Sequence, residues 1–174
     1  ILNTPTTTPS PPPGGIYVHI PFCLKKCLYC DFYSVSDLSL KSAFLQALLG
    51  EIRRVPKTSL VFDSVYIGGG TPSLFEPVQI SKIIETLYET FSMDTDPEIT
   101  LEVNPGTVDF EKLKGYLNAG VNRLSIGVQT FQNNLLETLG RIHSEKTSLD
   151  AVETAHRAGF ENIGLDLIFG IPGQ

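Results

Sequence analysis

All three cysteines of the 174-residue chain lie close together, at Cys23, Cys27 and Cys30, directly after an apolar run at 16–20. The spacing is CxxxCxxC, so one short loop offers three thiolates to a metal centre. A cubane iron–sulfur cluster has four irons and ordinarily takes four cysteine thiolates. Three thiolates would leave one iron without a protein ligand and open to a small molecule. The spacing therefore predicts a [4Fe–4S] cluster with one open coordination position.

A disulfide, a zinc site and chance clustering account less well for the cysteine spacing. A disulfide would leave one thiol over, and the sequence contains no further cysteine to pair with it. A structural zinc ion could take His19 as its fourth ligand, but zinc modules usually combine two close cysteines with a second, distant pair of ligands. Chance clustering of buried thiols does not fit Lys25, Lys26 and Tyr29, which mark an accessible loop. The iron–sulfur cluster is the preferred interpretation.

Composition indicates a globular chain that does not bind nucleic acid. Hydrophobic residues make up 41% and charged residues 18%, with a formal net charge of −6. No run of lysine and arginine is present to neutralise phosphates, so nucleic acid is not an expected partner. No apolar stretch approaches the roughly 20 residues of a membrane helix, so we expect no membrane span. Reduced cysteines favour a reducing compartment, and we expect a cytoplasmic location.

Apolar periodicity predicts alternating strands and helices. Residues 1–14, which are rich in Pro and Thr, predict a disordered tail, and 15–174 predict one domain. The expected strands are 16–20, 61–67, 99–103, 123–128 and 162–169. Helices are expected at 38–55, from 77 to about 91, from about 109 to 120, at about 135–139 and at about 149–159. This order requires right-handed crossovers and a parallel sheet, which is either an open doubly wound sheet or part of an α/β barrel.

Each expected strand ends in residues that could bind a ligand. The first leads to the cysteines and the second to a Gly-rich turn at 68–72, while the third carries Glu102 and Asn104. The fourth ends at Gln129 and the fifth carries Asp166. Ligands of parallel α/β proteins gather beyond the carboxyl ends of the strands. The sequence therefore predicts one site that is built by all five strand ends.

These residues also have purely structural interpretations. A Gly-rich turn often serves only as a tight connection, although bare backbone amides can approach a ligand closely. A carboxylate within an apolar strand needs a partner, so Glu102 or Asp166 could form an ion pair with Arg123 or Arg141. The histidines at 143 and 156 are assigned no role.

Six longer motifs carry a family resemblance. They are YVHIPFCxxxCxYCDF at 17–32, GGGTPS at 68–73, ExNPG at 102–106, NRxSxGVQxF at 122–131, LGRxH at 139–143 and DLIxGIPG at 166–173. Together they resemble the radical S-adenosylmethionine (SAM) proteins of the oxygen-independent coproporphyrinogen-III oxidase group. The resemblance implies a partial TIM-type (β/α)6 radical SAM barrel of about five βα units. It also implies that the chain is truncated at its C-terminal end, without the C-terminal domain of the group.

One position discriminates between two branches of this group. Coproporphyrinogen dehydrogenases carry a further cysteine two residues after the third, and this chain has Phe32 there. In this respect it resembles the heme chaperones of the HemW type. The resemblance implies that the three cysteines ligate the cluster and that SAM chelates the open iron. The residues that match SAM-holding positions of the family are Tyr17, Tyr29, Gly69, Gly70, Thr71, Glu102, Gln129, Arg141 and Asp166.

The resemblance also implies a job and partners. A protein of this kind binds heme or a porphyrin and passes heme to acceptor proteins, and its cluster needs an electron donor. The alternative is an enzyme that decarboxylates coproporphyrinogen III oxidatively, using the 5′-deoxyadenosyl radical that the reduced cluster releases from SAM. More remote alternatives are another radical SAM enzyme and a zinc-stapled binding module. We assign no catalytic residue from the sequence.

Overall fold

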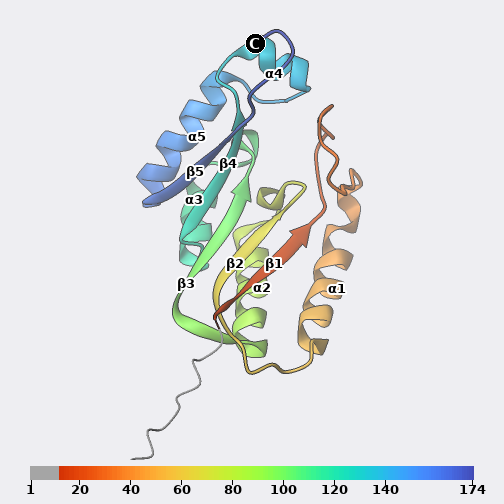
Figure 1. Ribbon diagram of the computed structural model, residues 1–174, viewed down its shortest axis with the longest axis vertical. Coiled ribbons are helices and arrows are strands. Elements are labelled where there is room, and N and C mark those ends of the chain that lie inside the picture. Colours follow the sequence, from red (N-terminus) through yellow and green to blue (C-terminus); the bar gives the residue numbers. More distant parts are fainter. Residues whose placement is uncertain (1–11) are drawn as a thin grey trace, which may run out of the picture.

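The computed structural model describes residues 12–174 as five strands that alternate with helices (Figure 1). The predicted tail lies outside the described residues except for 12–14, and Gly14 is already the first residue of a strand. The strands are β1 (Gly14–Ile20), β2 (Val61–Gly69), β3 (Ser92–Val103), β4 (Arg123–Gln129) and β5 (Asn162–Leu167). The α-helices are α1 (Lys41–Arg54), α2 (Pro77–Thr90), α3 (Phe110–Asn118), α4 (Asn133–Leu139) and α5 (Glu145–Ala158). The predicted order of elements is confirmed.

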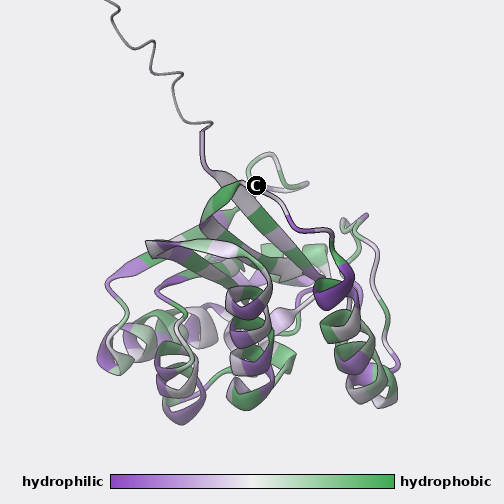
Figure 2. Cartoon of the chain, turned by 90° about the horizontal axis from the view of Figure 1, so that it is seen from below, coloured by the Kyte–Doolittle hydropathy of each residue, from purple (hydrophilic) through white to green (hydrophobic). Residues whose placement is uncertain are grey.

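The five strands form one parallel sheet in the order of the sequence, β1-β2-β3-β4-β5. Helices α1, α2, α3 and α5 all lie against the same face of this sheet (Figure 2). An open doubly wound sheet would carry helices on both faces, whereas a barrel carries them only on its outside. The fold is therefore an arc of a (β/α) barrel, as the family resemblance implies.

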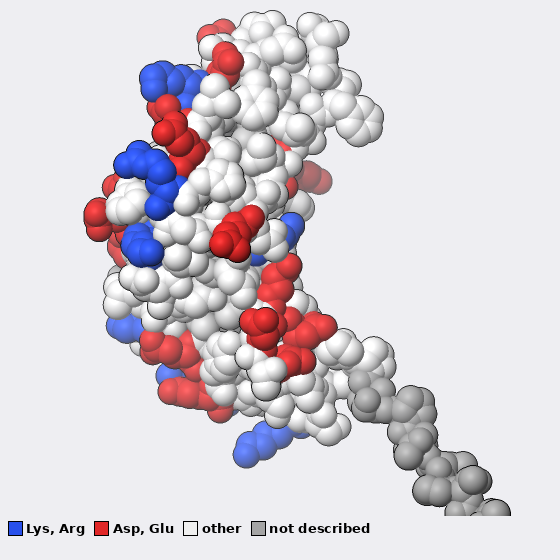
Figure 3. Space-filling view, turned by 90° about the vertical axis from the view of Figure 1, so that its left-hand side faces the viewer, with Lys and Arg blue, Asp and Glu red and all other residues white. Residues whose placement is uncertain are grey.

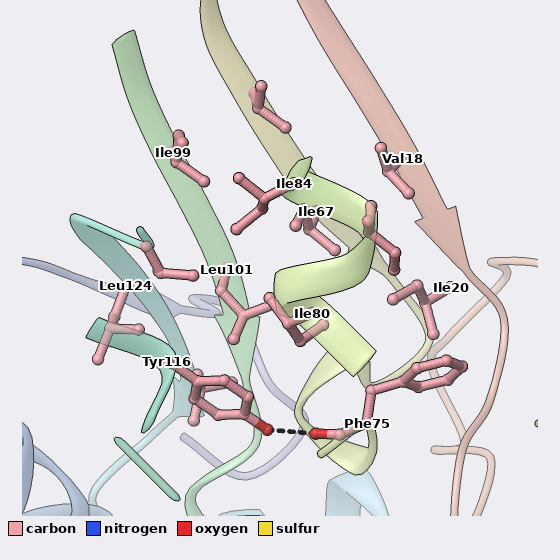
Figure 4. Close-up of a cluster of buried hydrophobic side chains, with 14 of the residues drawn as sticks. Val18, Ile20, Ile67, Phe75, Ile80, Ile84, Ile99, Leu101, Tyr116 and Leu124 are labelled. Carbon is pink, nitrogen blue, oxygen red and sulfur yellow. Dashed lines mark hydrogen bonds between the residues drawn. The ribbon is translucent and has the colours of Figure 1, made fainter. Parts of the chain in front are cut away.

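The core lies between the sheet and this helical layer. Residues Ile80 and Ile84 of α2 pack over Ile67 of β2 and Leu101 of β3 (Figure 4), and the first, third and fourth of these are fully buried. Their spacing puts them on one face of α2, whose N-terminus is closed by a capping box between Glu76 and Gln79. Burial of each such side chain contributes roughly 1.5–3 kcal/mol. This layer fixes the strands that carry the site.

The opposite face of the sheet, the inner side of the arc, is polar and aromatic. Tyr17 of β1 is 59% exposed there and Leu167 of β5 is 60% exposed. On the side that carries β5 and α5, Lys and Arg side chains are interspersed with Asp and Glu (Figure 3). None of the helices in residues 12–174 has the length and apolar character that a membrane crossing requires.

The carboxyl ends of the strands point to the top of Figure 1, where the segment after β1 and helix α4 also lie. Two loops meet there, since the backbone amide of Leu28 donates to the carbonyl of Leu139 at 3.2 Å. The cysteine loop is thereby tied to the end of α4, more than half the chain away in sequence.

Candidate iron–sulfur and cofactor site

The cysteine loop (residues 23–30) is anchored at its start. The amide of Cys23 donates to the carbonyl of Val35 at 3.0 Å, and the amide of Val35 donates to the carbonyl of Pro21 at 2.8 Å. These two bonds close the base of the loop as a short parallel bridge between Phe22 and Val35. The three thiols are held close to one another without being joined, since all three cysteines are free.

The thiols line a cavity of about 290 Å³ beyond the strand ends. Every strand contributes to its wall, as the sequence predicts. Of the residues expected to hold SAM, the wall contains Tyr29, Gly69, Gly70, Thr71, Glu102, Gln129, Arg141 and Asp166. It also contains Lys25, Lys26, Phe32, Pro72, Val103, Asn104, Ser125 and Gly127. The cavity thus joins thiols, cationic groups and carboxylates at one place.

Cys23 is the most enclosed of the three thiols. It is 9% exposed, and the hydroxyl of Thr71 donates to its Sγ at 3.6 Å. Burial raises the pKa of the Cys23 thiol, and the Thr71 hydroxyl acts in the opposite direction. A metal centre would deprotonate the thiol regardless, because metal binding competes with the proton.

Glu102 is held on the inner face of β3 by two donors. The hydroxyl of Tyr66 donates to Oε1 at 2.9 Å and the amide of Gly69 donates to Oε2 at 2.9 Å. Burial raises the pKa of Glu102, while these two bonds lower it. Gly68 makes room for the carboxylate, since a Cβ there would lie 2.9 Å from Oε1. The Glu102 carboxylate is therefore fixed in orientation before any ligand arrives.

Arg141 links the end of β4 to the cysteine loop. Its Nη2 donates to the carbonyl of Gly127 at 2.6 Å, and its Nη1 lies 3.6 Å from Sγ of Cys27 and 3.4 Å from the hydroxyl of Tyr29. Burial raises the pKa of Tyr29 to about 12 although Arg141 opposes the rise, so Tyr29 stays a neutral phenol. Within residues 12–174, Nε of Arg141 is buried without a hydrogen-bond partner. An unpaired cationic donor on the wall of a cavity favours an anionic or carboxylate-bearing ligand.

The predicted ion pairs of the strand carboxylates do not form. In the described part of the chain neither Glu102 nor Asp166 lies in a salt bridge, and Arg123 instead pairs with Glu98 at 3.8 Å. Asp166 accepts a hydrogen bond from the hydroxyl of Ser125 at 2.9 Å. Both carboxylates therefore keep free acceptor capacity towards the cavity.

Gln129 has an unusual backbone. It is the single non-glycine residue with positive φ in the described part of the chain, at 68°. The amide of Thr130 donates to the carbonyl of Val128 at 2.9 Å, so Gln129 is the centre of a γ-turn of the rare, strained type. Its side chain turns back over Gly127, where a Cβ would lie 3.0 Å from Nε2.

Tyr17 is the one predicted SAM-holding residue that does not line this cavity. Its hydroxyl lies 3.0 Å from Nδ1 of His19, and its ring stacks on Tyr66 at a centroid distance of 6.1 Å. Both tyrosines line a separate cavity of about 280 Å³ on the inner face of the sheet. Tyr17 is connected to the site only through Tyr66 and Glu102.

The geometry does not support the zinc alternative. In residues 12–174, no three His, Cys, Asp or Glu side chains converge as ligands of a single metal ion. His19, the proposed fourth ligand, uses Nδ1 with Tyr17 and Nε2 with the carbonyl of Tyr33 at 3.2 Å. One zinc ion would need thiolates within about 4 Å of one another, because Zn–S bonds are about 2.3 Å. A cubane cluster spreads its thiolates further apart, so the loop fits a cluster better than an ion.

Two further residues of the site were not predicted from the sequence. Tyr66, which orients Glu102, has the sequence context of an ordinary strand residue, and Ser125, which bonds Asp166, lies in a motif that gives it no role. A signal was available for Tyr66. In a parallel sheet it lies on the same face as Glu102, with Gly68 beside the carboxylate.

Comparisons with known proteins agree with this site. The family model described as the radical SAM superfamily matches residues 17–174. A heme chaperone HemW of Haemophilus influenzae is 41% identical over 95% of this chain and 45% of its own length. A zebrafish protein, radical S-adenosyl methionine domain-containing protein 1, mitochondrial, is 39% identical over 92% of this chain and 37% of its own length.

Among solved structures, the coproporphyrinogen III oxidase HemN of Escherichia coli, described as a radical SAM enzyme, superimposes with a TM-score of 0.83 at 34% identity. That match covers 93% of this chain and 38% of the HemN chain. The chain therefore spans less than half the length of the relatives it matches.

Proposed function

Because this chain belongs to the radical SAM superfamily, we propose that Cys23, Cys27 and Cys30 hold a [4Fe–4S] cluster and that the adjoining cavity binds SAM. The family implies both cofactors, and the donor set of the loop fits the first. Three free thiols lie at the mouth of one cavity. One thiol is enclosed, and the guanidinium of Arg141 lies 3.6 Å from a second. Anionic clusters are stabilised by such neighbouring donors.

The cavity also fits a ligand that is both cationic and anionic, as SAM is. Arg141 offers its unpaired Nε to a carboxylate. Glu102 and Asp166 offer acceptor oxygens to ammonium or hydroxyl groups, and the backbone around Gly70 comes close, since a Cβ there would lie 2.7 Å from the carbonyl oxygen of Phe22. When bound, the cluster and SAM would supply one-electron chemistry. This chain supplies the orientation and, together with the inner face of the sheet, the exclusion of water.

We further propose that the complete protein is a heme chaperone of the HemW type, which binds heme and transfers it to acceptor proteins. The observation that carries this choice is Phe32. It lies on the wall of the cavity and is 64% exposed, at the position where the dehydrogenase branch has a further cysteine. The identity to HemW of Haemophilus influenzae, 41%, agrees with it. A reducing compartment such as the cytoplasm suits three free thiols, and an electron-donor protein would reduce the cluster.

The second candidate is a coproporphyrinogen III dehydrogenase, favoured by the likeness to HemN. One anaerobic experiment separates the two. The complete, reconstituted protein is given SAM and coproporphyrinogen III, and in a parallel sample heme. We expect a stable heme absorption spectrum on the protein and no protoporphyrinogen. Formation of protoporphyrinogen would overturn the chaperone proposal and establish the dehydrogenase.

The cluster is tested separately with a matched pair of variants. Cys27→Ser removes one thiolate, and Leu28→Ser introduces the same side chain at the next residue, which is 80% exposed. We expect iron and sulfide to be lost in the first variant and retained in the second at about four of each per chain. Equal iron content in both variants would exclude Cys27 as a ligand.

A further inference from the structure

His143 is a buried histidine for which the proposed function has no use. It is 6% exposed and lies in the loop between α4 and α5. Its Nε2 lies 3.2 Å from the carbonyl oxygen of Val128. A carbonyl can only accept, so Nε2 carries the proton and donates. Nδ1 is then an acceptor, and it is buried without a partner in the described part of the chain.

The carbonyl that His143 contacts belongs to the strained turn at the end of β4. The same oxygen accepts the amide of Thr130 at 2.9 Å and so closes the γ-turn around Gln129. The next carbonyl, that of Gln129, accepts the amide of Ile168 at 2.9 Å. The register between β4 and β5 shifts at this place. His143 therefore bonds to the atom on which the unusual backbone of Gln129 depends.

The strain at Gln129 has a functional explanation. Glycine adopts positive φ without cost, whereas glutamine does not, so a glutamine at 68° indicates that its side chain is needed there. That side chain forms part of the wall of the cofactor cavity. Arg141, two residues before His143, bonds to the carbonyl of Gly127. One short loop thus holds two successive carbonyls at the end of β4.

We propose that His143 is a positioning residue: it clamps the γ-turn and so aims the Gln129 amide into the cofactor cavity. The proposal rests on the proposed binding of SAM in that cavity. His143 does not line the cavity and acts through Gln129. Its effect on SAM affinity should therefore disappear when the Gln129 side chain is absent.

The first test measures SAM binding by the complete, cluster-loaded protein. His143→Leu keeps the volume and removes the donor, and His143→Gln restores an N–H at a similar reach. We expect His143→Leu to weaken SAM binding about tenfold, the size of coupling between neighbouring groups, and His143→Gln to recover most of it. In the Gln129→Ala background, His143→Leu should cause no further loss. Equal losses in the Leu and Gln variants, or a full additional loss in the Gln129→Ala background, would overturn the proposal.

The second test needs no cofactor. In the cofactor-free protein, hydrogen exchange is measured at the amides of Thr130 and Ile168. Both should exchange faster in His143→Leu, whereas amides of α2 should not change. His156→Leu, the same change at an exposed residue of α5, is the matched control and should leave both amides protected. Unchanged exchange in His143→Leu would overturn the clamp.

The two tests separate the proposals from each other. If the wild-type protein binds no SAM, the proposed function fails, while amide exchange still decides the role of His143. If His143→Leu does not fold, His143→Gln takes its place. It should keep both the amide protection and the SAM affinity, and loss of either would overturn the clamp.

Discussion

Removal of the Tyr66 hydroxyl is expected to destabilise the cofactor-free protein in a pH-dependent way. In Tyr66→Phe the carboxylate of Glu102 loses the donor that lies 2.9 Å from Oε1 and keeps the amide of Gly69. Burial raises the pKa of Tyr66 to about 12, so its hydroxyl is a donor throughout the pH range of interest. A hydrogen bond to a charged group contributes about 1.5–3 kcal/mol. Because both side chains are half-buried, water replaces part of it, and we expect a net loss of about 1 kcal/mol at pH 7.

The sign of the pH dependence follows from Glu102. Burial raises its folded-state pKa above the usual value of 4.5. Its contribution to stability is therefore fully present below that usual value and is lost as pH rises through the folded-state pKa. Loss of the Tyr66 donor disfavours the carboxylate further and raises the pKa of Glu102 again. More stability is then lost on the way to pH 7, whereas the two proteins converge at low pH.

The assay is thermal unfolding of both proteins between about pH 4 and pH 8, always compared at the same pH. A deficit of about 1 kcal/mol corresponds to roughly 2–4 °C in a domain of this size. Tyr88→Phe is the matched control, because Tyr88 is 47% exposed and lies on the outer side of α2. A deficit of the same size at both ends of the pH range, or an equal deficit in Tyr88→Phe, would refute the reasoning.

Three further outcomes are expected. Gly70→Ala should lower stability by about 1–3 kcal/mol, measured by thermal unfolding, because its Cβ would lie 2.7 Å from the carbonyl oxygen of Phe22, whereas Gly106→Ala, with 3.8 Å to the nearest atom, should be tolerated. Arg141→Lys should release iron to a chelator about tenfold faster, because a single ammonium cannot reach both the cysteine loop and the end of β4; an unchanged rate would exclude this bridge. The isolated 174-residue segment should self-associate through the edge strand β5, and Leu167→Lys should reduce this in sedimentation, since that side chain is 60% exposed.

Much of the fold could be predicted because it depends on local patterns. The apolar spacing of α2 and the Gly cap at the end of α5 are readable from neighbouring residues. The family resemblance and the matching comparisons agree on the superfamily. The arrangement of helices on a single face could not be obtained this way, because the alternation of strands and helices is the same in a doubly wound sheet and in a barrel.

The sequence by itself determined the chemistry of this protein: three thiols at CxxxCxxC spacing, a carboxylate or amide at the strand ends, and Phe32 in place of a further cysteine. Those features are contained in residue types and short spacings. Only the tertiary structure decided which of them meet. It placed Arg141 beside Cys27, 114 residues away in sequence, turned Tyr17 towards His19 and away from the cavity, and put Gln129 into a strained turn. Such choices depend on how the carboxyl ends of separate strands come together, and no local pattern encodes that.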